Sequence, residues 1–332
     1  MGRVSTFADS EVIRLAKEKF VPVAGDDWYQ RRRQDAEGEF FRKVADQGPR
    51  KGAGASTRQG IYVFTAGGKL LGYRNSQDAE VMRGELVKAL AEFKKLPAAE
   101  RQPGAVKVED LPKVDTAYSR ALPKGGLVVN VYARILDKDA KGEICHGTCQ
   151  FEGGDRSSHD HLWLTEEDWK ALIPSSAKVG DNVPVPPRVL MRLLRFHFVD
   201  NTRGEPNFWG RREVRAQAIQ LSVTEVTPKA LTLELTGTAV LATDADLDKA
   251  KRGYDVALRG TIHYDREKKA IDRFEGVALG LHWGAGTLTG SARPGRTPLG
   301  IAFDLARGDS PLDQVPPQAA REWKNYLQAD RD

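Results

Sequence analysis

A series of long strand-like segments in the last two thirds of the chain constrains the fold most strongly. In residues 254–264, apolar side chains occupy alternate positions: Tyr254, Val256, Leu258, Ile262 and Tyr264. A strand that alternates in this way buries one face and leaves the other in water, which is typical of an antiparallel sheet. Further runs with the length and composition of strands lie at residues 126–136, 214–226, 230–242 and 271–281.

These segments predict a mostly antiparallel β domain over residues 125–310, built as a sandwich or an open barrel. Short polar connections at residues 227–229 and 265–269 are typical of hairpins. Short helices are expected at 165–172, 187–195 and 317–327, and a C-terminal helix occupies part of residues 311–332. The preceding segment, residues 97–124, contains four prolines and many charges, and it is interpreted as a linker.

Residues 1–96 have a different pattern, in which helices and strands are mixed. Apolar spacing predicts helices near 9–18, 36–46 and 78–95, with Asp9 or Ser10 capping the first. Residues 20–24 (FVPVA) are expected to form a short buried strand, and residues 61–65 and 69–74 a hairpin across Gly67 and Gly68. The whole chain is therefore expected to be an α+β protein.

The order of these elements resembles the thioredoxin fold from its second helix onward. The resemblance rests on DSEVIRLAKEKFVPVAGDD, GIYVFTAGGKLLGYRN and DAEVMRGELVKALAEF, and it covers residues 7–96. Thioredoxins carry a Cys-x-x-Cys pair before this point and a cis-proline ahead of the hairpin. Here no cysteine precedes Cys145, and residues 56–60 (STRQG) contain no proline. Because thiol–disulfide exchange needs an attacking thiolate, the expected domain is a truncated, redox-silent version of the fold.

Charge and hydropathy exclude several classes of partner. The 51 Lys and Arg residues against 46 Asp and Glu give a formal net charge of only +5, and acidic residues surround the basic run Arg31 to Arg33. We therefore expect no nucleic-acid partner. No apolar run approaches the roughly 18–20 residues of a transmembrane helix. The first 20 residues lack the apolar core of a signal peptide. A complete chain is therefore expected in the cytoplasm, and an exported one if an N-terminal segment was removed.

One candidate metal site lies between Cys145 and His161. The segment contains Cys145, His146, Cys149, Asp155, His159 and His161. In an extended chain His159 and His161 point to one face, while Leu162 and Leu164 point to the core. Imidazole and thiolate ligands favour zinc or copper over magnesium. Alternatively, the two histidines are ordinary hydrogen-bonded loop residues.

The state of the two cysteines stays open at this point. In a fully extended chain their Cα atoms would lie roughly 13 Å apart, beyond the reach of a disulfide. If the chain coils around Gly147, they approach within about 6 Å and form a disulfide or share a metal ion. Two unmodified thiols are the third possibility.

Two further segments carry candidate catalytic residues. His197, Asp200, Arg203 and Glu205 offer acid–base or anion-binding groups, and Trp209 could form the floor of a pocket. The alternative is an ordered turn held by an ion pair from Arg203 to Asp200 or Glu205. His282 follows a predicted strand and is flanked by Trp283 and glycines, which permit the close approach of a ligand. A packed tryptophan beside a hydrogen-bonded histidine is the alternative there.

Three functions remain in competition. The first is a binding or interaction protein, in which the β domain holds an unidentified small molecule or protein beside the redox-silent module. The second is a metal-dependent enzyme, such as an oxidoreductase, that uses His159 and His161 with His146 or a cysteine. The third is a thiol redox protein whose cysteine pair precedes Met1. The chain contains no complete catalytic triad, P-loop or dinucleotide motif that would decide among them.

Overall fold

A computed structural model describes residues 4–54, 56–101, 114–145, 149, 157–289 and 292–331. It divides into two compact units, Met1–Arg120 and Ala121–Asp332. The division falls within residues 97–124, the segment with the composition of a linker. Each unit has its own core, and each is described by itself.

The first unit combines a two-stranded antiparallel ribbon with helices. The ribbon pairs β1 (Ile61–Phe64) with β2 (Leu70–Arg74). The helices are α1 (Val4–Ala8), α2 (Ser10–Lys19), α3 (Asp27–Gln30), α4 (Ala36–Ala45), α5 (Ala79–Lys95) and α6 (Ala98–Arg101). The core of this unit consists of side chains from α2, β1 and α5, namely Val12, Val63, Met82, Leu86 and Ala89.

Aspartate side chains fix where the helices of this unit begin. Asp9 accepts hydrogen bonds from the backbone N–H groups of Glu11 and Val12, at 3.0 and 2.9 Å, so it caps α2 as the sequence predicts. Asp78 caps α5 in the same way. Such caps satisfy N–H groups that have no partner inside the helix, and each contributes about 1 kcal/mol.

The buried strand expected at residues 20–24 is not formed. Val21 and Val23 are 89% and 83% exposed, and the segment belongs to neither strand of the ribbon. Pro22 lies between them and has no N–H group to donate to a neighbouring strand. An apolar run alone therefore did not predict burial here, because a strand also needs a partner to pair with.

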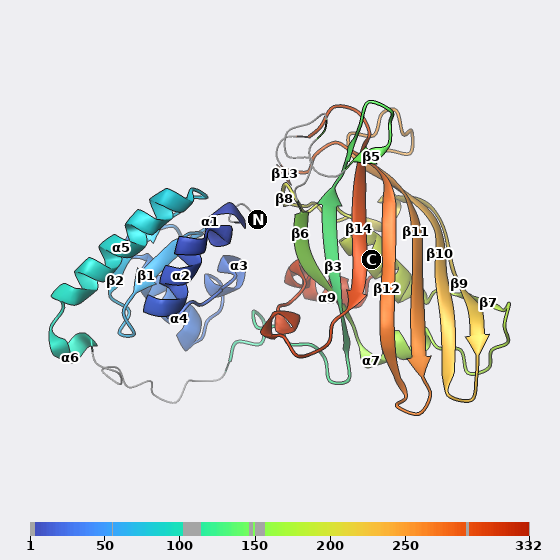
Figure 1. The fold of residues 1–332 in the computed structure, drawn as a ribbon, viewed down its shortest axis with the longest axis horizontal. Coiled ribbons are helices and arrows are strands. Elements are labelled where there is room, and N and C mark those ends of the chain that lie inside the picture. Colours follow the sequence, from blue (N-terminus) through green and yellow to red (C-terminus); the bar gives the residue numbers. More distant parts are fainter. Residues whose placement is uncertain are drawn as a thin grey trace. The chain divides into compact units, whose positions relative to one another are not determined.

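The second unit is built on one open sheet of eight antiparallel strands (Figure 1). In order across the sheet these are β6 (Ser157–Leu164), β3 (Leu127–Ile135), β14 (Thr297–Leu305), β12 (Ala270–Trp283), β11 (Gly253–Asp265), β10 (Ala230–Ala242), β9 (Val214–Val226) and β7 (Asn182–Pro184). The chain is thus an α+β protein, as the sequence predicts.

The expectation of a sandwich or a barrel is not confirmed. The edge strands β6 and β7 do not pair, so the sheet does not close, and helices rather than a second sheet cover its apolar face. These are α7 (Glu166–Ala171), α8 (Pro187–Arg192) and the π-helix η1 (Leu193–His197). Alternation along a strand shows that one face is buried but carries no information about what covers it.

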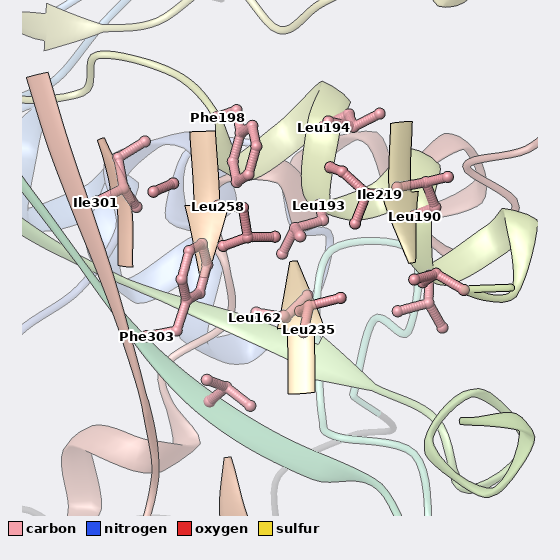
Figure 2. Close-up of a cluster of buried hydrophobic side chains, with 14 of the residues drawn as sticks. Leu162, Leu190, Leu193, Leu194, Phe198, Ile219, Leu235, Leu258, Ile301 and Phe303 are labelled. Atoms are coloured by element: carbon pink, nitrogen blue, oxygen red, sulfur yellow. The ribbon is translucent and has the colours of Figure 1, made fainter. Parts of the chain in front are cut away.

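The core of the second unit lies between α8–η1 and the sheet (Figure 2). Leu190, Leu193 and Leu194 from the helices face side chains of the strands, which include Leu235, Leu258, Ile301 and Phe303. Full burial of one leucine contributes about 1.5–3 kcal/mol, so this layer supplies much of the stability of the sheet. None of the helices in the described ranges is long and apolar enough to cross a bilayer.

Smaller elements complete the unit. They are the strand pairs β4 (Asp137–Lys138) with β5 (Ile144–Cys145) and β8 (Gly204–Glu205) with β13 (Leu288–Thr289), the 3₁₀ turns η2 (Arg211–Glu213), η3 (Pro311–Gln314) and η4 (Gln318–Glu322), and helix α9 (Trp323–Leu327). The helix expected at 317–327 is thus a 3₁₀ turn followed by a short α-helix.

The C-terminal segment is held against the sheet edge by buried hydrogen bonds. The Tyr326 hydroxyl accepts the Trp163 backbone N–H at 3.0 Å and lies 3.1 Å from Nε2 of His197. The fully buried Arg192 donates to the carbonyl oxygens of Trp163 and Tyr326, at 3.0 and 2.8 Å, and pairs with Asp168. Removing one partner would leave a buried polar group without a hydrogen bond.

We therefore predict that Tyr326→Phe lowers the free energy of unfolding of the second unit by about 1–3 kcal/mol, because the Trp163 N–H loses its acceptor. Chemical denaturation of the full chain measures this loss. Tyr264→Phe is the control, because no described residue hydrogen bonds to the Tyr264 hydroxyl, and it should have little effect. An equal loss of unfolding free energy in the two variants would contradict a stabilising role for the Tyr326 hydroxyl.

Candidate functional site

A small pocket lies at the end of the sheet where β11 and β14 begin and β12 ends. Its polar and aromatic lining consists of Asp200, Arg203, His282, Trp283, Arg293 and Thr297, and Ile135 and Leu299 lie beneath them. The free space is on the scale of one water molecule. The pocket brings together two segments that the sequence analysis treated as separate candidates.

A tight turn after η1 fixes the carboxylate of Asp200. One carboxylate oxygen accepts the backbone N–H and the hydroxyl of Thr202, at 2.9 and 2.7 Å, and the other accepts Nε of Arg203. Asp200 is only 5% exposed. The ion pair that served as the alternative interpretation of this segment is therefore present, and it also holds both groups at the pocket.

Arg203 connects this turn to the end of β12. Its Nη2 donates to the carbonyl oxygen of Gly284 at 2.9 Å, across 81 positions of sequence. Gly284 has a φ of +78°, and an added Cβ would lie 1.9 Å from the Lys251 carbonyl oxygen. Only glycine fits both requirements, so this residue sets how closely the two segments approach.

His282 contributes an imidazole to the same pocket from β12. It is 6% exposed, pairs with Thr297 across the sheet, and its ring lies 6.0 Å from that of Tyr254. Burial is the main cause that lowers the pKa of His282 to about 4; Asp200 acts against the shift, and the cations Arg203 and Arg252 contribute to it. The imidazole is therefore neutral near pH 7 and can both donate and accept a hydrogen bond.

The pKa of Asp200 is shifted so that the carboxylate stays ionised. Burial acts to raise the pKa of Asp200, but His282, Arg203 and the hydrogen bonds from Thr202 lower it further than burial raises it. Among the described lining residues, Asp200 is the one carboxylate, whereas Arg203 and Arg293 are both cations. The pocket therefore has a surplus of positive charge.

Two of the predicted catalytic residues lie elsewhere. His197 is buried against Tyr326, with its Nδ1 3.9 Å from Asp160, and Glu205 pairs with Arg321 at 2.7 Å. Trp209 is packed in the core beneath Arg252, whose guanidinium lies 3.8 Å from its ring centroid, so it is not a pocket floor.

Arg252 and Thr297 were not singled out from the sequence. Arg252 is 7% exposed although it lies in a run, Lys251 to Gly253, that has the composition of a solvated turn. Thr297 starts a strand whose position beside His282 depends on pairing of distant segments. Neither residue carries a local signal that would have identified it.

The two cysteines form a disulfide, with Cα atoms 6.7 Å apart. The disulfide is one of the three states that the sequence left open, beside a shared metal ion and two unmodified thiols. In the disulfide, Cys145 and Cys149 offer no thiolate to a metal ion. His146 and Asp155 lie outside the described residues. Across the described ranges, no three His, Cys, Asp or Glu side chains gather as a ready ligand set.

His159 and His161 lie together on the outer face of β6, while Leu162 and Leu164 are fully buried in the core, as predicted. Their ring centroids are 4.7 Å apart, and Tyr132 stacks on His159 at 4.6 Å. Burial and, to a lesser extent, the neighbouring His159 lower the pKa of His161 to about 4 against the opposing effects of Asp313 and the main chain of Val315. Burial also lowers the pKa of His159.

Comparisons with protein-family models, curated proteins and solved structures found no match to this chain.

The shifted pKa of His282 predicts a pH dependence of stability. A folded-state pKa of about 4, against an ordinary value of 6.5, means that the unfolded chain binds this proton more readily. The contribution of His282 to the free energy of unfolding is therefore complete above pH 6.5. It declines by at most about 3 kcal/mol as the pH falls from 6.5 to 4. Relative to the wild type, His282→Gln should lose less stability over this interval, as measured by denaturant unfolding. If the free energy of unfolding changed equally with pH in the two proteins, the lowered pKa of His282 would be disproved.

Proposed function

We propose that the chain is a binding protein whose second unit takes up a small anionic molecule in the pocket at the end of the sheet. The observation that carries this proposal is the convergence of Arg203, Arg293 and His282 with the single carboxylate of Asp200. Buried charges are costly, and groups with shifted pKa values in a concave site are typical of binding and catalytic sites.

The size of the pocket favours a ligand with one oxyanion group. Because the free space is on the scale of one water molecule, a single carboxylate or phosphate oxygen would fill it while the rest of the ligand stayed at the rim beside Trp283. Arginine binds such groups through paired N–H donors, and neutral His282 can donate a further hydrogen bond. Asp200 would then keep Arg203 in position.

The first unit supports a role in interaction rather than thiol chemistry. Residues 1–120 contain no cysteine, so the thioredoxin-like pattern proposed for residues 7–96 carries no thiolate in this chain. The thiol redox hypothesis, which needs cysteines before Met1, stays a prediction.

Anion binding can be tested with inorganic phosphate and acetate as probes. We expect both to produce a saturable shift of the His282 ring signals in NMR spectra of the full chain, because a bound anion stabilises the protonated imidazole and raises the pKa of His282. Arg293→Gln should weaken binding by about 10-fold or more, since it removes a charge-assisted hydrogen bond.

Arg259→Gln is the matched control, because it removes the same charge from a well-exposed side chain of the sheet. Arg203→Lys is a second pocket variant that keeps the charge beside Asp200 while removing the paired donors. The proposal fails if phosphate and acetate leave His282 unshifted, or if Arg259→Gln and Arg293→Gln weaken binding equally.

A further inference from the structure

The histidine pair on β6 is separate from the anion pocket. His159 and His161 are two positions apart in a regular strand, so both rings project from the outer face of the sheet. The pocket lies against Ile135 and Leu299, which belong to the core beneath the opposite face. A function of the histidine pair is therefore independent of the proposed anion binding.

A hydrogen bond fixes the tautomer of His159. Its Nε2 lies 3.0 Å from Oδ1 of Asn130, on the neighbouring strand β3. Since a carbonyl oxygen only accepts, Nε2 carries the proton and donates it, which leaves the lone pair of the ring on Nδ1. Histidines that bind metals are commonly oriented in this way, with the second nitrogen donating to a carbonyl or carboxylate.

His161 is a buried imidazole whose ring nitrogens make no well-formed hydrogen bond to a described residue. It is 3% exposed, and the main chain of Val315 lies near enough to oppose the lowering of its pKa without meeting the geometry of a hydrogen bond. Leaving a buried polar group without a partner costs about 1–3 kcal/mol, so a residue in this state calls for an explanation. A ligand bound beside His159 would supply the missing interaction.

A carboxylate lies near both rings. Asp313, in η3, is close enough for its charge to act on His159 and on His161. One of its carboxylate oxygens accepts the Gly308 backbone N–H at 2.9 Å. Two imidazoles and one carboxylate are donors typical of sites for first-row transition metals.

We propose that His159 and His161 bind a divalent transition-metal ion, zinc or copper, on the outer face of β6, with Asp313 as a third ligand. Because these side chains are not already gathered as a closed set of three, water completes the coordination and Asp313 moves toward the ion on binding. Such an open site binds copper more tightly than zinc, following the general order of affinities for nitrogen ligands. Asn130 acts as a positioning residue that holds His159 in the binding tautomer.

The test is titration of the full chain with Cu²⁺ and with Zn²⁺, followed by calorimetry, together with the electron paramagnetic resonance spectrum of the Cu²⁺ complex. We expect one ion per chain and a spectrum with coupling to two imidazole nitrogens. His159→Asn and His161→Asn should each weaken binding by well over about 10-fold, since the loss of an outer positioning residue alone commonly costs about 10-fold. Asn130→Ala should weaken it less.

His263→Asn is the matched control, because it removes a histidine from a different part of the sheet, where it pairs with Asp272. His146→Asn tests the one other histidine close in sequence. The spectrum of the wild type guards against a variant that fails to fold, since it needs no substitution. Coupling to fewer than two nitrogens, or binding that survives in both His159→Asn and His161→Asn, would overturn the proposal. So would binding lost only in His146→Asn.

Discussion

The second unit depends on one constraint: an eight-stranded sheet that does not close must have its apolar face covered by something else. Here the cover consists mainly of two short helices, α8 and the π-helix η1, which pack Leu190, Leu193 and Leu194 against the apolar face of the sheet. Burial of these side chains holds strands from distant parts of the chain in one sheet. The positions of the candidate sites follow from this arrangement.

The pocket forms where the helical cover ends. After η1 the chain turns at Asp200 and crosses the end of the sheet, and Arg203 joins this turn to the carbonyl of Gly284 at the end of β12. The turn and the strand end thus bring charged groups out of water at the rim of an apolar core, where electrostatic interactions are stronger than at the surface. The same packing shields His282 and keeps its imidazole neutral.

Strands, helix starts and the faces of side chains were predictable from the sequence, because they depend on interactions between residues close together in the chain. Alternation located the long strands, Asp9 marked the start of α2, and period-two spacing placed His159 and His161 opposite Leu162 and Leu164. The prediction of a sandwich or a barrel was not confirmed, because alternation does not show what covers a face. The expected strand at residues 20–24 was wrong because pairing depends on a neighbour that the segment does not have. The meeting of Arg203 with Gly284 depends on the long-range pairing of strands, which no local pattern encodes.

The central claim is that the cluster of Arg203, Arg293 and His282 is an anion site. The most direct measurement is a crystal structure of the full chain soaked in selenate, whose selenium is located by anomalous scattering. The account predicts an anomalous peak within hydrogen-bond distance of Arg293 and His282, at the position now open to a water molecule. Selenate bound only at exposed surface lysines and arginines, with this pocket closed by its own side chains, would contradict it.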